Sequence, residues 1–247
     1  ASRLRPVYAH EFDSGELLRT YILQCLSSEK DESEYRVLDY TSARFKKQKS
    51  DFFRLCGGSL GGKARGLAFA RFMIKQSGIE EEFEDVTIRV PDCAVVGTHE
   101  FDQFMKDNQL WQKALKIADN KKLERAFKKA RLSIDLILKL ESFIRDHKNP
   151  LAVRSSSLLE DSQYQPLAGS YQTIMLPNNS RSTKKRLNEL MIAIKNVFSS
   201  TFKGEAKSLL DSTGHRIEEE KMAVVIQEIV GQSYKSKRFY PTFSGVL

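Results

Sequence analysis

One segment restricts the possible folds of this chain more than any other: the sequence CGGSLGGKARG at residues 56–66. Glycine permits backbone turns that other residues cannot adopt, and it lets the main chain approach a ligand closely. Apolar residues from Leu67 to Ile74 follow at helical spacing, so the loop is predicted to open a buried helix. The N–H groups of such a loop suit a phosphate, and Lys63 adds a full positive charge. The alternative interpretation is a flexible turn before a helix.

The same loop satisfies most of the Walker A pattern, from Gly57 to Lys63. That pattern requires Ser or Thr as the next residue to hold magnesium, and this chain has Ala64. Residues 51–56, which precede the loop, also look like a poor buried strand. The sequence therefore disfavours a P-loop NTPase.

Apolar patterns along the rest of the chain predict strands that alternate with helices, and hence a central sheet of the α/β or α+β class. Strands are expected at residues 86–90, 94–96, 151–153, 173–176 and 222–230, and helices at residues 12–27, 67–74, within 100–148, and from Ser182 or Thr183 onward.

Composition excludes several classes of protein. The 247 residues allow one large domain or two smaller ones, and no apolar run reaches the roughly 18 residues that a membrane helix needs. The net charge of +8 attracts phosphate, but the basic residues are scattered and do not alternate with aromatic residues as in RNA-binding proteins. Three distant cysteines favour a reducing cytoplasm over a disulfide framework, and four scattered histidines lack metal-ligand spacing.

A second candidate cluster is LAVRSSSLLEDSQYQPLAGSYQT, at residues 151–173. It places Arg154 at the end of a predicted strand among serine hydroxyls, a combination that suits an oligophosphate. Gly169 precedes a polar turn into the next strand, where a backbone can approach a ligand closely. The alternative is an arginine paired with Glu160 or Asp161 in a structural turn.

A third cluster is MAVVIQEIVG, at residues 222–231. Gln227 and Glu228 interrupt an apolar strand, and buried polar groups need partners. At a strand end, such side chains and their backbone can read the edge of a base such as adenine. The alternative is that both face solvent at the margin of the sheet.

Taken in order, these segments resemble the nucleotide-binding domain of the phosphoenolpyruvate synthase and pyruvate phosphate dikinase family. GGKARGLAFA resembles its GGKGANLAEM-type loop, and MAVVIQEIV resembles MAVVVQRMV. Further matches lie in VPDCAVVGTHEFDQF, in the VRSSSLLED segment and in AIKNVFSSTFKGEA. The resemblance covers residues 57–247. Two departures are Ala64, in place of a loop glycine, and the leucine pair at 158–159.

The resemblance implies a partial ATP-grasp domain with a mixed sheet and flanking helices, and a phosphotransferase that uses ATP and Mg²⁺. It implies that Lys63 and Arg154 hold the ATP phosphates and act in catalysis. Gly169 and Thr173 match positions that line the phosphate site. The strand and hinge that receive adenine correspond to Gln227, Glu228 and Val230.

The resemblance also implies a division of the chain and a set of partners. Residues 1–56 are expected to be a helical or irregular extension, and 57–247 the first part of the nucleotide-binding domain, with a helical subdomain at 100–148. We expect the magnesium ligands, a swivelling phosphohistidine domain and the pyruvate-binding domain beyond residue 247, so that this fragment alone is inactive.

Several alternatives stay open at this stage. The parent enzyme converts ATP, pyruvate and water to AMP, phosphoenolpyruvate and phosphate, or is a dikinase that uses phosphate or another acceptor. A basic regulatory or nucleic-acid-binding module is the alternative of another class, although nucleic acid is not the expected partner. A membrane is not expected as a partner either, and a homo-oligomer is left open.

Overall fold

The computed structural model describes residues 38–40, 52–79, 90–157, 171–204, 220–234 and 238–244, and the single positions or pairs 14, 82–83, 85–86, 88 and 206–207. The chain divides into two compact units, residues 1–36 and 37–247. The fold below is that of the second unit. Apart from Ser14, which is a bend, the predicted helix at residues 12–27 lies outside the described residues.

A six-stranded mixed sheet forms the centre of this unit, in the order β1-β2-β3-β6-β4-β5. β1, β2 and β3 run parallel to one another, whereas β6 is antiparallel to both β3 and β4, and β4 is antiparallel to β5. The strands are β1 (Leu38–Asp39), β2 (Phe52–Cys56), β3 (Cys93–Val96), β4 (Leu151–Ser157), β5 (Thr173–Leu176) and β6 (Met222–Glu228). A separate hairpin pairs β7 (Gln232–Tyr234) with β8 (Arg238–Tyr240).

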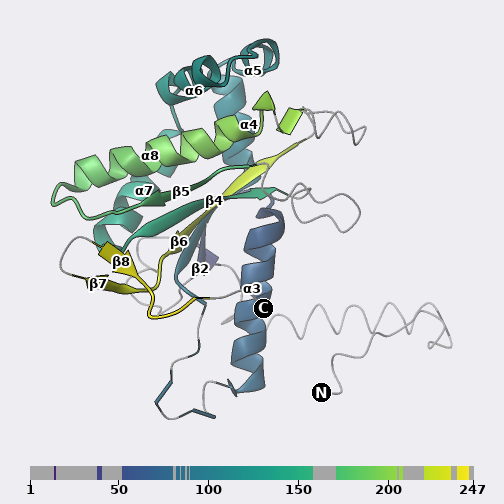
Figure 1. Cartoon of the computed structure of the whole chain (residues 1–247). Coiled ribbons are helices and arrows are strands. Elements are labelled where there is room, and N and C mark those ends of the chain that lie inside the picture. Colours follow the sequence, from purple (N-terminus) through teal and green to yellow (C-terminus); the bar gives the residue numbers. More distant parts are fainter. Residues whose placement is uncertain are drawn as a thin grey trace. The chain divides into compact units, whose positions relative to one another are not determined.

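Helices flank the sheet, as Figure 1 shows. They are α3 (Gly61–Ser77), α4 (Thr98–Asp107), α5 (Trp111–Lys116), α6 (Asn120–Lys129), α7 (Ile134–Asp146) and α8 (Thr183–Ser200). The fold is therefore α+β with a mixed sheet and flanking helices, as predicted, and it is consistent with a partial ATP-grasp-like domain.

Alternate residues of the central strands supply two separate cores. On β6, Val224 and Ile226 join a large core with the helices α4, α6, α7 and α8, whereas Val225 joins a small core with Ala64 and Leu67 of α3. Successive side chains of a strand point to opposite faces, so α3 covers one face and the other helices cover the opposite one. The chain between β3 and β4 is almost wholly helical, which explains the long amphipathic pattern there.

Short polar residues begin three of these helices by accepting backbone hydrogen bonds. Asp119 caps α6, Ser133 caps α7 and Ser182 caps α8. Such a cap satisfies N–H groups that have no partner within the helix. The predicted start of a helix at Ser182 or Thr183 is thus confirmed.

Two local predictions are wrong. Residues 52–56 form the buried strand β2, although the sequence suggested a poor strand. The reason is that both faces of β2 are covered: Phe53 and Leu55 pack in the large core, and Phe52 packs in the small core on the opposite face. Val86, Ile88 and Val90 lie outside any strand, and Val86 is exposed. β-propensity alone does not form a strand: Val90 packs against the small core beside α3 without belonging to a strand.

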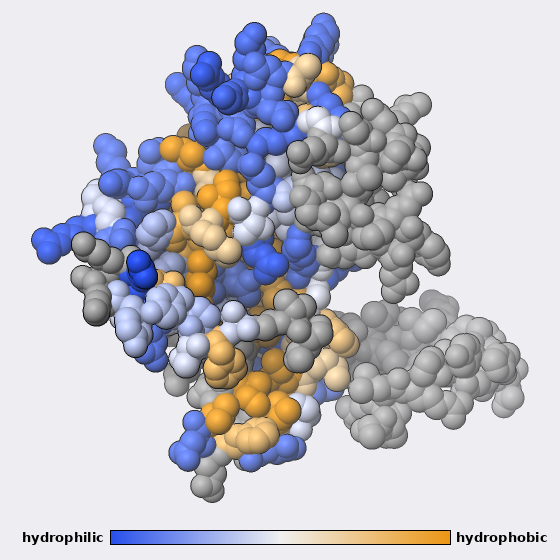
Figure 2. Space-filling model, viewed as in Figure 1, coloured by the Kyte–Doolittle hydropathy of each residue, from blue (hydrophilic) through white to orange (hydrophobic). Residues whose placement is uncertain are grey.

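Figure 2 shows a mainly hydrophilic surface over the region of α6, at the top of the view, with a smaller apolar area beside it. Among the described residues, no helix combines the length and the apolar character that crossing a membrane requires.

Candidate functional site

The glycine-rich loop is held in place by the turn that follows β3. The Ser59 N–H donates to Thr98 Oγ1 over 2.9 Å, and the Thr98 N–H donates back to the Ser59 carbonyl over 3.0 Å. The His99 N–H donates to the Gly57 carbonyl over 3.2 Å. These bonds give the loop a defined conformation, so that it is more than a flexible turn.

The N-terminus of α3 packs directly against β4. Ser156 Oγ donates to the Leu60 carbonyl over 2.8 Å and accepts the Ala64 N–H over 3.0 Å. Gly61 has a φ of +75°, and a Cβ atom on it would lie only 1.7 Å from the Ser156 carbonyl oxygen. Glycine is therefore required at this position, and the helix begins with its positive end at the β4 backbone.

Both predicted phosphate ligands are connected to β4. Lys63, in the first turn of α3, donates from Nζ to Ser155 Oγ over 3.4 Å. Arg154 is the residue before Ser155, and its Nη1 donates to Gln227 Oε1 over 3.1 Å. Lys63, 91 positions before Arg154 in the sequence, thus contacts the residue that follows Arg154 on β4, although strand alternation directs the Ser155 and Arg154 side chains to opposite faces.

Strand register places Thr173 and Gln227 beside Arg154. Arg154 pairs with Thr173 on β5 and with Val225 on β6, and directly paired residues point to the same face. Gln227 lies two residues beyond Val225 and therefore shares that face. The result is a polar row of Thr173, Arg154 and Gln227 on the side of the sheet that carries α3, where Thr173 is exposed and the other two are half-buried.

A buried carboxylate fixes the C-terminal end of β4. Glu220 is 2% exposed and accepts hydrogen bonds from the Ser157 hydroxyl and, over 3.0 Å, from the Tyr171 hydroxyl. Ser157 precedes and Tyr171 follows residues 158–170, so this carboxylate joins both ends of that segment to the residues before β6. Gly169 itself lies outside the described residues.

The remaining predicted base-binding residues lie apart from that row. Glu228 is the last residue of β6, and strand alternation sends its side chain to the face opposite Gln227. There its Oε1 accepts a hydrogen bond from Asn149 Nδ2. Val230 follows the strand and is 57% exposed.

A hollow lined in part by Cys56, Gly57, His99 and Glu100 lies beside the start of the glycine loop. Burial raises the pKa of Glu100, although its carboxylate accepts hydrogen bonds from the N–H and hydroxyl of Ser133. Burial, followed by the Glu100 charge, raises the pKa of the Cys56 thiol to about 12. Cys56 is therefore protonated at neutral pH, which excludes a thiolate nucleophile at this position.

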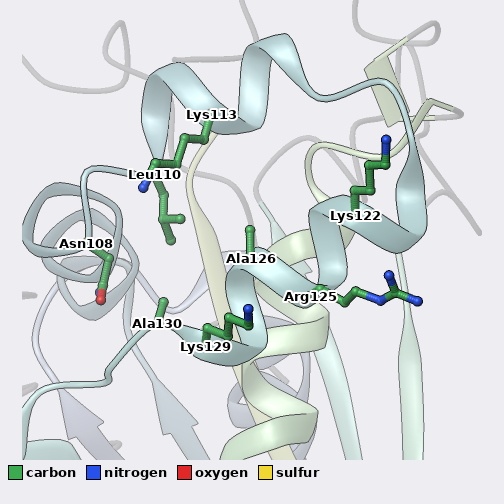
Figure 3. A pocket seen from close by; sticks show the side chains of 8 residues that line it. All are labelled: Asn108, Leu110, Lys113, Lys122, Arg125, Ala126, Lys129 and Ala130. Atoms are coloured by element: carbon green, nitrogen blue, oxygen red, sulfur yellow. The ribbon is translucent and has the colours of Figure 1, made fainter.

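A basic hollow of about 460 Å³ lies on the helical part of the chain, between α5 and α6. Its lining includes Lys113, Lys122, Arg125 and Lys129, whose charged ends spread in different directions rather than meeting at one point (Figure 3). This arrangement is typical of solvated helix faces and does not favour the nucleic-acid alternative.

Sequence reasoning named the serines after Arg154 only as a group and did not find Glu220. In the structure, each of the three serines has a different partner: Ser155 accepts a hydrogen bond from Lys63, Ser156 accepts one from the Ala64 N–H at the start of α3, and Ser157 donates one to Glu220. No local pattern marks Glu220, because its partners lie 49 and 63 positions away in the sequence.

The fold and this site define a class of α+β domain in which a glycine-rich loop opens a helix that carries Lys63 and packs against the strand that carries Arg154. Residues 58–247 match the family model of the pyruvate phosphate dikinase AMP/ATP-binding domain, and the chain belongs to this family. Its resemblance to that family, inferred from the sequence, is thus confirmed.

The chain is also similar to the uncharacterized phosphotransferase YvkC of Bacillus subtilis (strain 168), with 28% identity over 144 residues. The match covers 57% of this chain and 16% of that protein. The chain therefore spans a small part of the length of this curated relative. At the level of the family, it is an ATP-binding member of the phosphotransferase type.

Proposed function

We propose that residues 57–247 hold the phosphates and base of ATP as part of a longer enzyme related to phosphoenolpyruvate synthase. One observation carries the proposal: Lys63 reaches Ser155, the residue next to Arg154, across 92 positions of sequence. A cation at a helix N-terminus, Lys63, and an arginine on the strand against which that helix packs, Arg154, would together suit the negative charge of a triphosphate. In phosphoryl transfer, such groups stabilise the charge that develops on the transferred group.

In this proposal, different residues of the polar row Thr173, Arg154 and Gln227 bind different parts of ATP. Arg154 would hold phosphate oxygens, while the Thr173 hydroxyl adds a donor from the neighbouring strand. The hydrogen bond from Arg154 to Gln227 orients the amide, whose remaining donors are suited to an adenine edge. Gly169 and Val230 would complete the phosphate and base ends. Because the Glu228 side chain turns to the other face, only its backbone would contribute to binding the base.

When bound, magnesium would neutralise part of the negative charge of the phosphates. Glu220, the carboxylate at this end of β4, is 2% exposed, and its Oε1 accepts hydrogen bonds from Ser157 and Tyr171. On the family resemblance, we propose that the magnesium ligands lie beyond residue 247.

The proposed overall reaction converts ATP, pyruvate and water to AMP, phosphoenolpyruvate and phosphate. The β-phosphoryl group would pass through a histidine on a separate swivelling domain to pyruvate, and the γ-phosphoryl group to water. A dikinase would instead pass the γ-phosphoryl group to phosphate and release pyrophosphate. A cytoplasmic location accompanies this proposal, and it is supported by the use of ATP and by Cys56 and Cys93, which form no disulfide among the described residues.

Displacement of a fluorescent ATP analogue by MgATP tests the nucleotide site in the full-length protein. We expect Lys63→Met and Arg154→Met each to weaken MgATP binding at least tenfold. Arg154→Lys should restore only part of the loss, because an ammonium cannot bind two oxygens in the planar manner of a guanidinium.

Matched controls are Lys75→Met, at the other end of α3, and Arg145→Met, an exposed residue of α7. Circular dichroism should show that all variants are folded. Wild-type affinity in both Lys63→Met and Arg154→Met would refute the nucleotide site. Isotope tracing of the γ-phosphoryl group then separates a water-using synthase from a dikinase.

A further inference from the structure

Three metal-ligating side chains from distant parts of the sequence meet at the end of the sheet away from Lys63. Asp92 precedes β3, His147 caps the end of α7, and Glu228 ends β6. One ligand atom from each, the His147 ring nitrogen and two carboxylate oxygens, lies within 4.8 Å of the others. We propose that these three residues bind a divalent transition-metal ion of the Zn²⁺ type.

The spacing of the ligand atoms fits a shared ion better than a direct contact. His147 Nε2 lies 3.7 Å from Asp92 Oδ2, which is longer than the roughly 2.7–2.9 Å of a charged hydrogen bond. Ligands about 2.1 Å from a tetrahedral zinc ion are separated from one another by about 3.4 Å. A shift of a few tenths of an ångström therefore brings these two atoms to the separation that a common metal ion requires.

The imidazole is already held in the orientation that a metal ligand needs. His147 Nδ1 lies 3.0 Å from the Phe143 carbonyl oxygen, and a hydrogen bond there directs the Nε2 lone pair toward Asp92. The ring also stacks on Phe143 with a centroid separation of 4.1 Å. Metal-bound histidines commonly donate their second ring N–H to a backbone carbonyl in this way.

The carboxylates provide two further observations. Asn149 Nδ2 donates to Glu228 Oε1, which orients that group as a supporting residue does around a metal. Asp92 Oδ1 is buried and has no hydrogen-bond partner among the described residues. A buried carboxylate oxygen normally has a partner, and a bound cation would supply one.

The surroundings favour a cation, and the donor set favours a transition metal. His147 lies at the C-terminal end of α7, where the helix dipole and the last carbonyl groups attract positive charge. An imidazole nitrogen with two carboxylates suits zinc and related ions, whereas magnesium prefers oxygen ligands alone. With three protein ligands, a fourth position would be left for water.

This site is separate from the proposed phosphate site. Glu228 pairs with Leu151 at the start of β4, whereas Lys63 contacts Ser155. Four residues of strand correspond to about 13 Å. A metal ion here would connect the C-terminal ends of α7 and β6 to the residue that precedes β3. One of its ligands, Glu228, directly follows Gln227 in the chain.

Titration with Co²⁺, followed by its visible absorption, tests the proposal on the chain freed of any affinity tag. We expect one Co²⁺ per chain, visible bands of a four- or five-coordinate ion, and displacement by Zn²⁺. His147→Ala and Asp92→Asn should each weaken Co²⁺ binding at least tenfold, whereas Glu141→Gln on the outer face of α7 should not change it.

Thermal unfolding provides a second measurement for variants that fold less well. Excess Zn²⁺ should raise the melting temperature of the wild-type chain and of Glu141→Gln, but not of His147→Ala or Asp92→Asn, since a ligand that binds only the folded state stabilises it. Absence of Co²⁺ bands in the wild type, or equal affinity in the wild type, His147→Ala and Asp92→Asn, would overturn the proposal.

Discussion

Gly61 and Ser156 approach so closely that a single added carbon atom on Gly61 would lie 1.7 Å from the Ser156 carbonyl oxygen. This contact sets the position of α3 against β4, and with it the position of Lys63 beside Ser155. The glycine therefore contributes to the candidate site through its lack of a side chain, without contacting a ligand itself.

Gly61→Ala should destabilise the fold by about 3 kcal/mol or more, because the new carbon clashes with backbone and the residue has a left-handed φ. Gly66→Ala on the same helix meets no atom within 4 Å and should stabilise the fold by about 0.5–1 kcal/mol. Urea unfolding of both variants measures the difference. Equal stability of the two variants would show that the close contact does not exist in solution.

Ser156→Ala should lower the free energy of unfolding by about 1–3 kcal/mol. Its hydroxyl is fully buried, and removing it leaves the Ala64 N–H and the Leu60 carbonyl without this partner. Ser77→Ala, at the exposed end of α3, is the control and should change stability by less than about 0.5 kcal/mol. Similar losses in the two variants would argue against a special role for Ser156.

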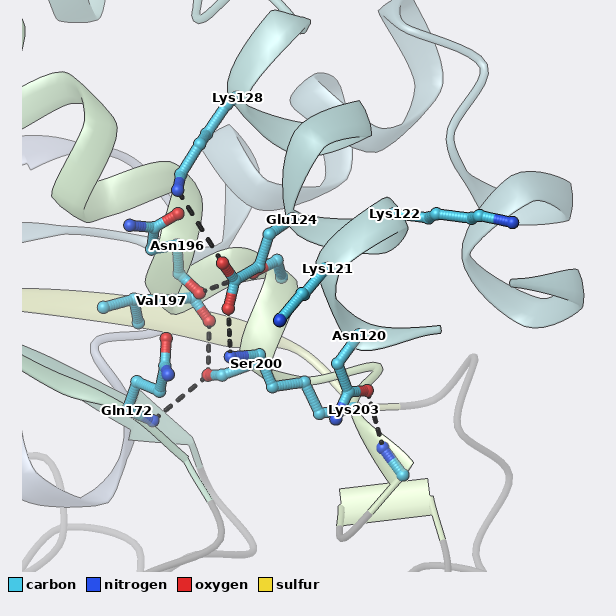
Figure 4. Close-up of polar contacts among 12 residues, drawn as sticks. Asn120, Lys121, Lys122, Glu124, Lys128, Gln172, Asn196, Val197, Ser200 and Lys203 are labelled. Carbon is cyan, nitrogen blue, oxygen red and sulfur yellow. Dashed lines mark hydrogen bonds and ion pairs between the residues drawn. The ribbon is translucent and has the colours of Figure 1, made fainter. Parts of the chain in front are cut away.

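The contact between α6 and the turn that follows α8 should depend on pH through Glu124 (Figure 4). Lys203 Nζ lies 2.6 Å from its carboxylate, and this hydrogen bond lowers the pKa of Glu124 in the folded chain. A carboxyl group with a lowered folded pKa stabilises the fold above its unfolded pKa of about 4.3, and this stabilisation disappears as pH falls through the folded value.

Glu124→Gln should therefore cost about 0.5–1 kcal/mol of stability at pH 7 and almost nothing at the lowest pH at which the fold persists. Unfolding curves at several pH values check this, with Glu141→Gln in the exposed pair with Arg145 as the control. A difference between wild type and Glu124→Gln that stays constant from pH 7 to pH 3 would contradict the assignment.

Cys56 should resist alkylation at pH 8. Its pKa of about 12, caused by burial and then by the Glu100 charge, leaves about a thousandth of the thiolate that an ordinary cysteine carries. Peptide mapping after brief treatment with iodoacetamide measures the rate, and the same chain in guanidinium shows full reactivity. A folded-state rate within tenfold of that of glutathione would disprove the raised pKa.

Sequence patterns determined the elements whose forces are local. Ser182 and the apolar stripe after it predicted α8, because a side chain that caps a helix and a helical face are properties of nearby residues. The segment from Met222 onward predicted a strand buried on both faces, and β6 lies at the centre of the sheet. The glycine loop, the lysine and the family resemblance likewise came from short contiguous segments.

Tertiary structure alone decided which of these segments meet. β2 became a strand because cores on both sides of the sheet bury its side chains, and no local propensity shows such cores. Which face of the sheet carries Gln227, beside Arg154, and which carries Glu228 follows from the register of β6 with β4. Asp92, His147 and Glu228 show no ligand spacing in the sequence, because residues that are far apart along a chain are brought together only when the whole sheet and its helices pack.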